Sequence, residues 1–359
     1  MEIRENVRLA AYTTLKVGGD ARYFAEAASD DDVIDAVGWA RARGLPVFVL
    51  GGGSNLLVSD TGFHGLVLHM SIAGIEVRDH DGKRIFSVGA GVEWDTFVVR
   101  AVKDNCAGVE CLSGIPGSVG GTPIQNVGAY GQDVSETIVR VCAVDAMTLE
   151  PVGFDKSECG FSYRQSRFNG GEAGRYIVTR VDYALQPGGA PKIAYADLKR
   201  HFAEYAAPAL SKVREAVLAI RRAKGMVLDE EDADSRSAGS FFKNPVVSIA
   251  EYERIAATSA LPVPHFEASP GDVKLAAAWL IEQAGIGKGF ALGPVAISSK
   301  HTLALVNRGG ATASDVLRMK DLVQRRVRER FAVELLPEPV MLGFGSGDPL
   351  LVEKGRDKE

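Results

Sequence analysis

The sequence has no pattern typical of a metal centre, a nucleic-acid-binding surface or a membrane span. None of the four cysteines forms a Cys-x-x-Cys pair, and the six histidines show neither His-x-His nor His-x-x-x-His spacing, so we expect no bound metal. The net charge is −5, from 41 basic and 46 acidic residues, which gives no basic footprint for nucleic acid. No run of 18 apolar residues occurs, and we therefore expect no membrane span.

Several nucleotide-binding and catalytic motifs are also missing. The pair of glycines at Gly89 and Gly91 lacks the third glycine of a Rossmann fingerprint, and no Walker A loop is present. Ser240 is not in a Gly-x-Ser-x-Gly elbow, so a hydrolase nucleophile is not supported. The charged segment 1–6 lacks the apolar stretch of a signal peptide, which together with the unpaired cysteines predicts a cytoplasmic protein.

The composition predicts a folded chain of about two domains. Of its 359 residues, 46% are hydrophobic and 24% are charged. Strands and helices do not alternate regularly, which favours an α+β fold. We expect a first domain over 1–190, a break near the Pro/Gly cluster 187–191, a second domain over 210–331, and a segment 332–350 that returns to the first. Periodicity predicts an Asp81-Gly82 hairpin turn and helices over 29–44, 93–105, 211–224, 273–284 and 314–331.

Two glycine clusters are the strongest indication of a ligand. One follows an apolar strand at 51–55, and the other lies in the uncharged loop 113–131. Residues without a side chain let backbone N–H groups approach a ligand and form a nest for an anion such as a diphosphate. Each cluster alone is also compatible with a tight turn, but the two together favour a buried cofactor.

Three single residues carry possible chemistry. Arg164 is either a surface ion-pair partner or an anchor for a carboxylate. Ser240 lies either in a turn or at a site where its hydroxyl donates a proton. Glu338 stands between two prolines, where it is either an exposed loop residue or a carboxyl whose pKa burial would raise. We interpret the acidic stretch 229–239 as a solvated linker.

At these positions the chain resembles the UDP-N-acetylenolpyruvoylglucosamine reductase (MurB) family, flavoenzymes of bacterial cell-wall precursor synthesis. The matching stretches spread over nearly the whole chain; they are 13–19, 51–55, 113–131, 161–166, 239–245 and 337–343. The resemblance implies an FAD-binding domain of the vanillyl-alcohol-oxidase (PCMH) type followed by an α+β substrate-binding domain. It also implies NADPH as the reductant and UDP-N-acetylglucosamine enolpyruvate as the substrate.

The resemblance assigns roles to individual residues. Arg164, Ser240 and Glu338 fall on the family's catalytic positions. We expect substrate contacts from Tyr163, Lys224, Asn244 and Tyr195, the last of which resembles the closing tyrosine of a subtype with an extra loop. We expect non-covalent FAD, because segment 51–55 has no histidine for flavin attachment. The expected FAD contacts come from both glycine loops: Gly51, Gly52, Gly53, Ser54, Asn55, Ser113, Gly117, Ser118, Gly120, Gly121, Gln125, Asn126 and Gly128.

Two other functions stay open at this stage. The chain is either a different flavin enzyme of the same fold, such as an oxidase that passes electrons to O₂, or a flavin- or nucleotide-binding module without catalysis. Fast reoxidation by air would indicate the first, and a yellow protein that NADPH does not bleach would indicate the second. We expect a monomer.

Overall fold

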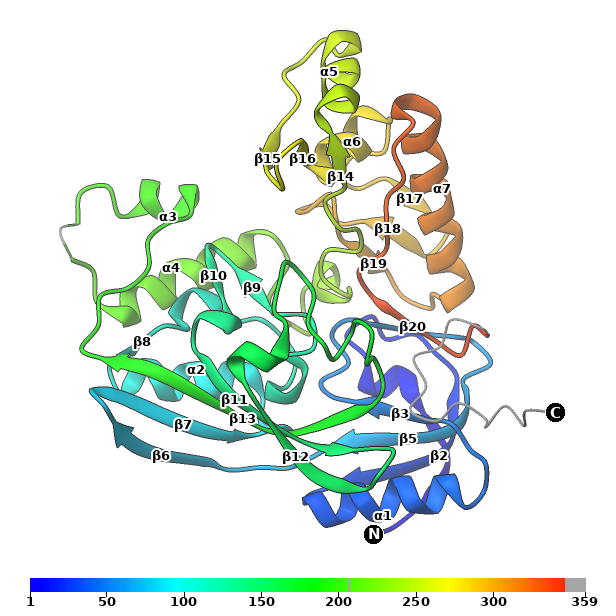
Figure 1. Ribbon diagram of the computed structural model, residues 1–359. Helices are drawn as coiled ribbons and strands as arrows, with labels where there is room; N and C mark the ends of the chain where they lie inside the picture. Colours follow the sequence, from blue (N-terminus) through cyan, green and yellow to red (C-terminus); the bar gives the residue numbers. More distant parts are fainter. Residues whose placement is uncertain (206, 346–359) are drawn as a thin grey trace.

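The computed structural model describes residues 1–205 and 207–345. Its first part is a four-stranded sheet in the order β1-β2-β5-β3, covered on one face by α1 (Figure 1). Strands β2, β5 and β3 are parallel, and β1 is antiparallel to β2. The bounds are β1 Arg4–Arg8, β2 Asp20–Ala27, α1 Asp30–Arg41, β3 Val47–Leu50 and β5 Phe63–Met70.

The sequence explains where α1 begins and ends. Ser29 caps it by accepting a hydrogen bond from the Asp32 N–H at 3.1 Å, and three acidic residues occupy the first turn, where the helix dipole favours negative charge. Gly44, with φ +62°, follows the last turn in a left-handed conformation. The apolar side of α1 is buried on the sheet.

The second part is a larger antiparallel sheet in the order β12-β11-β13-β7-β6, with β8 beside β13. The hairpin between β6 and β7 turns at Asp81 and Gly82, which both have positive φ, as the sequence predicted. Helix α2 (Trp94–Lys103) packs on this sheet. The strand bounds are β6 Ile75–His80, β7 Lys83–Gly89, β8 Cys106–Ala107, β11 Ile138–Asp145, β12 Glu150–Asp155 and β13 Tyr176–Pro187.

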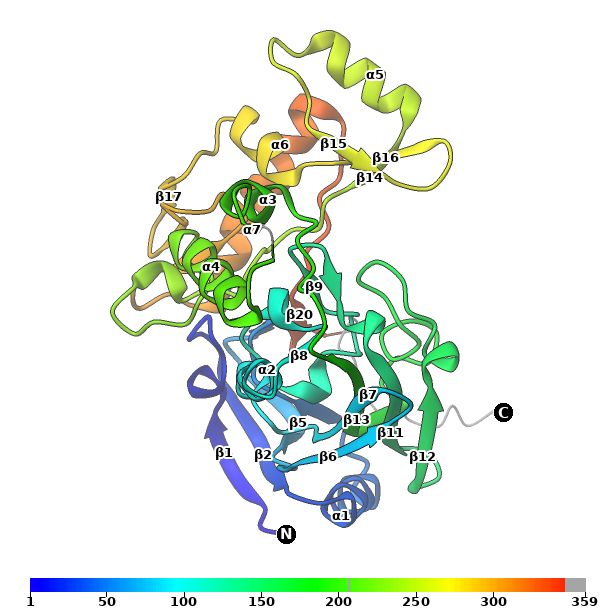
Figure 2. The same ribbon diagram turned by 90° about the vertical axis from the view of Figure 1, so that its left-hand side faces the viewer.

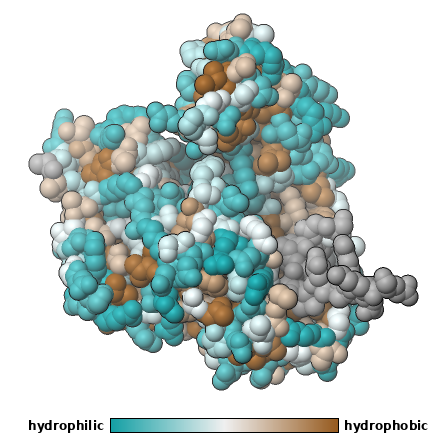
Figure 3. Space-filling view, viewed as in Figure 1, coloured by the Kyte–Doolittle hydropathy of each residue, from teal (hydrophilic) through white to brown (hydrophobic). Residues whose placement is uncertain are grey.

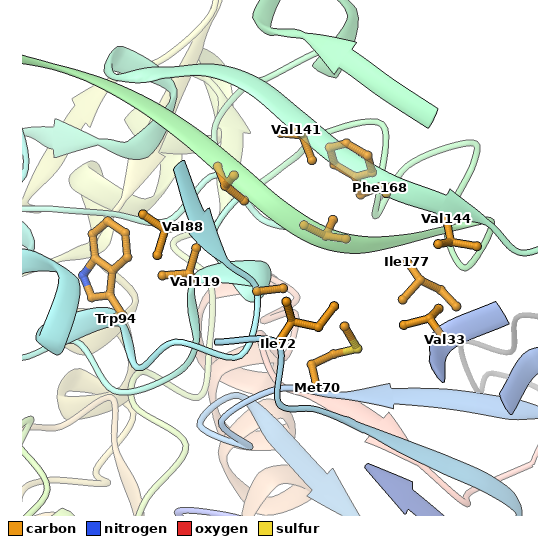
Figure 4. Packing of buried hydrophobic residues seen from close by; sticks show 14 of the residues in the cluster. Val33, Met70, Ile72, Val88, Trp94, Val119, Val141, Val144, Phe168 and Ile177 are labelled. Carbon is orange, nitrogen blue, oxygen red and sulfur yellow. The ribbon is translucent and has the colours of Figure 1, made fainter. Parts of the chain in front are cut away.

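One hydrophobic core joins these two parts. Met70 and Ile72 at the end of the first sheet pack in the same cluster as Val88 and Trp94 of the second (Figure 4). Because separating the two sheets would expose this shared apolar core, they form a single folded unit. We call this unit the two-sheet body.

The third part stands above both sheets (Figures 1 and 2). It contains two small sheets, β14-β16-β15 and β17-β18-β19, with α5, α6 and α7 around a second core, to which Leu15, Val17 and Leu57 of the first part also contribute. The bounds are β14 Val246–Ser248, α5 Ile249–Thr258, β15 His265–Glu267, β16 Asp272–Leu275, α6 Ala277–Gln283, β17 Ala291–Leu292, β18 Val295–Ile297, β19 Leu305–Asn307 and α7 Ala313–Phe331.

One predicted helix is wrong at its start. We expected a helix over 273–284, but β16 occupies its first residues and α6 begins only at Ala277. Strand β16 lies between β14 and β15, and a strand of four residues is too short to show alternation in the sequence. Pairing with distant strands therefore decides the structure here, rather than local periodicity.

The end of the described chain returns to the first part. Strand β20 (Val340–Leu342) pairs in parallel with β4 (Leu56–Val58), and the Ser59 N–H donates to the Leu342 carbonyl at 2.8 Å. The same corner holds α7, because Asp60 accepts hydrogen bonds from the backbone of Ala313 and Ser314. Of the returning segment expected over 332–350, residues 346–350 lie outside the described residues.

Helix α4 (Leu210–Ala223) packs with the two-sheet body, although we expected the second domain to begin at 210. Arg214 makes two 2.6 Å hydrogen bonds to Asp95 of α2, and Arg221 donates to the Gly114 carbonyl at 3.2 Å. The change of core therefore lies after α4, where the third part begins. In the described ranges no helix is both long and apolar enough to cross a membrane.

The acidic stretch 229–239 is solvated only in its first residues and turns inward from Asp232. Asp234 is only 2% exposed, its carboxylate accepts a hydrogen bond from Ser299 at 2.5 Å, and Arg308 lies 3.1 Å away. Lys300 pairs with Asp232 at 2.7 Å. Asp232 and Asp234 are matched by basic and hydroxyl partners from around β19, whereas Asp229, Glu230 and Glu231 are exposed. A pattern of charge along the chain does not reveal this difference.

Candidate active site

Three segments from distant parts of the sequence lie side by side where the third part meets the others. The Glu338 N–H donates to the Phe241 carbonyl at 2.9 Å. On the other side, the Val340 N–H donates to the Asn55 carbonyl at 2.9 Å, and the Asn55 side chain donates to the Glu338 carbonyl at 3.3 Å. This ladder brings the 51–55 loop, the 239–243 segment and Glu338 together.

Arg164 lies in direct contact with Glu338. Its Nε lies 3.3 Å from Glu338 Oε1, and the two side chains are 23% and 16% exposed. Arg164 adopts a positive φ of 56°, and its Nη2 donates to the Gly128 carbonyl at 2.9 Å, which fixes the guanidinium against the glycine loop. From the sequence alone, each of these residues could also have been exposed at the surface. In the structure they form a half-buried pair.

The electrostatics of this pair favour a carboxyl that holds a proton. Burial raises the pKa of Glu338, and the positive charges of Arg164 and Lys243 offset only part of that rise. Glu338 is therefore a better proton donor near neutral pH than an exposed glutamate. The two interpretations of the sequence are resolved in favour of burial.

Ser240 lies in the segment that pairs with Glu338. It follows Gly239, which has φ +72°, and precedes Phe241, whose N–H donates to the Leu303 carbonyl at 2.7 Å. Since the Phe241 carbonyl accepts from Glu338, Ser240 is one residue from the backbone contact to the carboxyl-bearing segment. Its side chain is half-buried.

The two glycine loops touch each other and form a cradle. A Cβ at Gly52 would lie 2.6 Å from the Cα of Gly117, and a Cβ at Gly51 would lie 2.5 Å from Ser118 Oγ. Ser54 ties the loops by donating to the Pro116 carbonyl at 2.8 Å. Glycine at these positions lets the two loop backbones pack together, and backbone N–H groups in such loops are the donors that a diphosphate binds.

Several other residues expected to contact FAD use their side chains to shape the loop. Ser113 is buried and donates to the Glu110 carbonyl at 2.7 Å, and Gln125 accepts from Asn55 at 3.0 Å. Asn126 donates to the Ser162 carbonyl at 3.0 Å, which joins the glycine loop to the segment of Arg164. The Gly120 position is packed against Ala90, whereas Gly121 has free space around its Cα.

Tyr163 lies where the two-sheet body meets the third part. The tyrosine is 52% exposed, and the Nζ of Lys274 from β16 lies 4.1 Å from the centre of its ring. Figure 3 shows the surface recessed beneath the upper part, with hydrophilic residues around it. Lys274 was not singled out from the sequence, since an isolated lysine in a short strand has no local pattern.

Tyr195 and Lys224 meet at Tyr130 on the α3–α4 side. Tyr195 precedes α3 (Ala196–His201), is 42% exposed, and packs edge-on against Tyr130 with 5.3 Å between ring centres. Lys224 Nζ is 5.7 Å from the same ring and 3.5 Å from Asp197 Oδ2. Burial raises the pKa of Tyr130 and Tyr195, so both hydroxyls keep their protons.

Asn244 has a defined structural contact. Its side-chain oxygen accepts a hydrogen bond from the Ala277 N–H at 3.0 Å, at the start of α6. The oxygen is therefore engaged within the third part, and the amide nitrogen is the group of Asn244 left to donate to a ligand.

A supporting ion pair beneath the glycine loop was also missed by sequence reasoning. The Gly114 N–H donates to Asp95 at 2.6 Å, and Arg214 pairs with the same carboxylate. Burial opposes ionisation of Asp95, but the hydrogen bonds from Arg214 and Gly114 outweigh it and lower its pKa. Over the described ranges, no group of three His, Cys, Asp or Glu side chains is placed to hold a metal ion.

Comparisons with known proteins agree with this geometry. A family model for an FAD binding domain matches residues 21–148, and a model for the C-terminal domain of UDP-N-acetylenolpyruvoylglucosamine reductase matches residues 231–342. The first match confirms the expected FAD-binding domain, and the mixed sheets and helices confirm the α+β class.

Whole-chain relatives carry the same name. The UDP-N-acetylenolpyruvoylglucosamine reductase of Thermobifida fusca is 47% identical over 94% of this chain and 97% of that protein, and that of Streptomyces coelicolor is 46% identical over 93% and 89%. The crystal structure of UDP-N-acetylenolpyruvylglucosamine reductase (MurB) from Thermus caldophilus covers 95% of this chain and all of its own, with a TM-score of 0.65 and 28% identity. This chain belongs to the UDP-N-acetylenolpyruvoylglucosamine reductase family.

Proposed function

We propose that this chain is an FAD-dependent oxidoreductase that uses NADPH to reduce UDP-N-acetylglucosamine enolpyruvate to UDP-N-acetylmuramate. The single observation that carries the proposal is the Arg164–Glu338 pair, 3.3 Å apart, on a backbone ladder shared with Ser240 and the 51–55 loop. A cation, a carboxyl and a hydroxyl beside a dinucleotide cradle are the groups that this reaction requires. The family membership supports the same function.

The glycine cradle of Gly51–Gly53 and Gly117–Ser118 is the part of the chain that would hold the FAD diphosphate without a covalent bond. When bound, FAD supplies hydride chemistry, taking hydride from NADPH and delivering it to the terminal carbon of the enolpyruvyl group. The protein's task is to make that delivery favourable, because hydride addition to an enol ether is electronically difficult.

Arg164 would stabilise the charge that develops on the substrate carboxylate. Electrons that arrive at the terminal carbon of the enol ether flow toward the carboxylate, and a fixed cation lowers the energy of that dianionic transition state. The guanidinium is held by Gly128 and is only 23% exposed, so the cation is in place before reaction.

Glu338 would act as a hydrogen-bond or proton donor to the same carboxylate. This role needs a protonated carboxyl, and burial between Pro337 and Pro339 raises the pKa of Glu338 in the required direction. An ionised Glu338 would instead repel the developing negative charge.

Ser240 would protonate C2 of the substrate. A hydroxyl is a weak acid, but a carbanion is a strong enough base for the transfer. The position of Ser240, one residue from the backbone contact with Glu338, supports this role.

Tyr163, Tyr195, Lys224 and Asn244 are proposed to bind the nucleotide part of the substrate. Tyr163 and Tyr195 both expose their rings, and Lys224 would provide positive charge for a diphosphate beside Tyr130, the ring against which Tyr195 packs. We assign the chain to the subtype in which a tyrosine such as Tyr195 closes over the substrate. A cytoplasmic location and a monomeric state stay predictions.

The test is a sequence of visible spectra on the purified protein. We expect flavin absorption at the start, bleaching when NADPH is added without oxygen, and recovery when UDP-N-acetylglucosamine enolpyruvate is then added. Fast recovery in air alone would instead indicate an oxidase. A yellow protein that NADPH does not bleach, or a colourless protein that takes up no FAD, would contradict the proposal.

A further inference from the structure

Glu110 is a fully buried carboxylate that the proposed reaction does not use. It lies in the short helix η2 (Glu110–Leu112) and has no exposed surface. Three N–H donors meet its two oxygens: the Gly108 backbone on Oε2 at 2.7 Å, and the Gln132 side chain and the Lys192 backbone on Oε1 at 2.8 and 2.9 Å. Burial of a carboxylate costs folding free energy unless its oxygens accept hydrogen bonds, so these three contacts are needed to keep Glu110 in place.

Two of the three donors belong to segments that carry site residues. Gln132 begins β10 (Gln132–Asp133), which pairs with β9 (Gly128–Ala129) in a hairpin. That hairpin bears Tyr130 at its turn and offers the Gly128 carbonyl to Arg164. Glu110 therefore holds the hairpin whose Gly128 carbonyl binds Arg164, the proposed catalytic arginine.

Lys192 begins the segment that leads to Tyr195. The Lys192 peptide is held at both ends, because its N–H donates to Glu110 and its carbonyl accepts from the Cys111 thiol at 3.1 Å. Burial raises the pKa of Cys111 to about 12, so the thiol stays protonated and can donate. The next residues touch the hairpin, since a Cβ at Gly131 would lie 3.2 Å from the Cβ of Ala194.

Beyond Tyr195 the segment is packed through few anchors. Leu198 and Phe202 are buried in a small cluster with Cys111 and Val217 of α4, which is separate from the main core. Tyr195 itself rests edge-on against Tyr130. The Tyr195 ring is therefore positioned by the backbone at Lys192 and by its contact with Tyr130 of the hairpin. Glu110 is hydrogen-bonded to both of these segments.

We propose that Glu110 is a positioning residue that fixes the Tyr195 segment and the Arg164-supporting hairpin relative to each other. The inference rests on the proposed function, because it assigns Glu110 a part in binding the enolpyruvyl nucleotide. Its carboxylate accepts hydrogen bonds from both the β9–β10 hairpin and the segment that leads to Tyr195, and so holds the two at a fixed separation. The Ser113 hydroxyl donates to the backbone carbonyl of Glu110, which connects Glu110 to the start of the glycine loop as well.

Only an acceptor at both oxygens satisfies this arrangement. In Glu110→Gln the side chain keeps its shape, but one oxygen becomes an NH₂ group that points at an N–H donor, either from Gly108 or from Lys192 and Gln132. The substitution thus breaks hydrogen bonds that hold the two segments at Glu110, without creating a cavity. Glu136→Gln is the matched control, because Glu136 pairs with the side chain of the same Lys192 at 2.8 Å on the exposed surface.

The experiment compares steady-state and half-reaction kinetics of the FAD-loaded wild type, Glu110→Gln and Glu136→Gln. We expect Glu110→Gln to raise KM for UDP-N-acetylglucosamine enolpyruvate about tenfold, as the loss of a satisfied buried acceptor predicts, while bleaching by NADPH alone changes less than about threefold. Glu136→Gln should stay within about twofold for both, as expected for an exposed pair. Amide hydrogen exchange in 192–202 should be faster in Glu110→Gln, and the substrate should protect that segment less than in the wild type.

A folded Glu110→Gln protein with unchanged KM and unchanged exchange would overturn the inference. So would an equal loss in both half-reactions, since that pattern indicates general scaffolding. If Glu110→Gln does not fold, Cys111→Ala tests the same anchoring of the Lys192 segment more gently; we expect a smaller rise in KM that Cys111→Ser reverses, and no difference between the two would also refute the inference. A wild type that is not reoxidised by the enolpyruvyl nucleotide would refute the proposed function instead, so the two failures are distinct.

Discussion

Arg164 and Glu338 contact each other with 3.3 Å between Nε and Oε1, yet burial still raises the pKa of Glu338. The two observations together describe a pair in which desolvation outweighs the attraction of the cation. A pair of this kind differs from an ordinary surface ion pair, because the carboxyl gains from holding a proton. Under the proposed function, the charge of Arg164 would serve a substrate carboxylate.

The stability of Glu338→Gln relative to the wild type should rise with pH. A carboxyl whose pKa is higher in the folded than in the unfolded state contributes stability below its unfolded value, here 4.5, and loses it as pH rises through the folded value. Glutamine does not ionise, so the difference in Tm between the variant and the wild type should grow from pH 4.5 upward. Thermal unfolding at about pH 4, 6 and 8, on either side of the ordinary glutamate pKa, measures it. A difference that shrinks over that range would argue against a raised pKa.

The same substitution should lower turnover. The introduced glutamine side chain would still donate a hydrogen bond but not a proton, and we expect kcat to fall about 100-fold, within the range for loss of one preorganised group. Reduction of the flavin by NADPH should be nearly unchanged, since that half-reaction develops no charge on the substrate carboxylate. Full turnover by Glu338→Gln would remove Glu338 from the mechanism.

Arg164→Lys should be far from conservative. The guanidinium faces Glu338 with Nε and donates to the Gly128 carbonyl with Nη2, and a lysine has a single nitrogen for both contacts. We expect kcat with the enolpyruvyl nucleotide to fall about 100-fold or more while the charge is kept. Stopped-flow reoxidation of the reduced enzyme checks this, and near-normal reoxidation would show that charge alone is sufficient.

Ser240→Ala should separate the two half-reactions. Removal of the hydroxyl takes away the proposed donor to C2, for which a loss of about 100-fold or more in reoxidation by the enolpyruvyl nucleotide is expected. Bleaching by NADPH serves as the internal control and should stay near the wild-type rate. Equal slowing of both steps would show that Ser240 shapes the cleft rather than protonating the substrate.

The local elements of this fold were predictable because their causes are local. Ser29 caps α1, the Asp81-Gly82 pair turns the β6–β7 hairpin, and α7 follows the apolar spacing expected over 314–331. Each depends on residues within a few positions of one another, so the sequence contains the whole cause.

The contacts between distant segments were not predictable in this way. The pairing of Arg214 with Asp95 draws α4 into the two-sheet body, and the pairing of Asp234 with Ser299 and Arg308 folds the acidic stretch inward. In both cases a charged residue is paired with a partner far along the chain, which a local pattern does not reveal. The proposed catalytic residues could be named from a family resemblance, but the burial of Arg164 and Glu338 and the contact between them needed the structure.

Gly52→Ala tests whether the cradle depends on the contact between the two glycine loops. Its added Cβ would lie 2.6 Å from the Cα of Gly117, well inside the separation at which carbon atoms attract. Since the atom in the way is backbone, the loops must move apart. We expect the dissociation constant for FAD to rise about tenfold or more, in line with the usual cost of overpacking, and titration of the apoprotein by flavin fluorescence measures it.

Gly171→Ala provides the matched control for this variant. Gly171 has no heavy atom within 4 Å of the added Cβ and does not need a left-handed backbone, so alanine should be accepted there. Its FAD affinity and Tm should stay at wild-type values. If Gly52→Ala binds FAD as tightly as Gly171→Ala does, the approach of Gly52 to Gly117 is a packing detail of the loops, and the diphosphate must be held elsewhere in the glycine-rich segment.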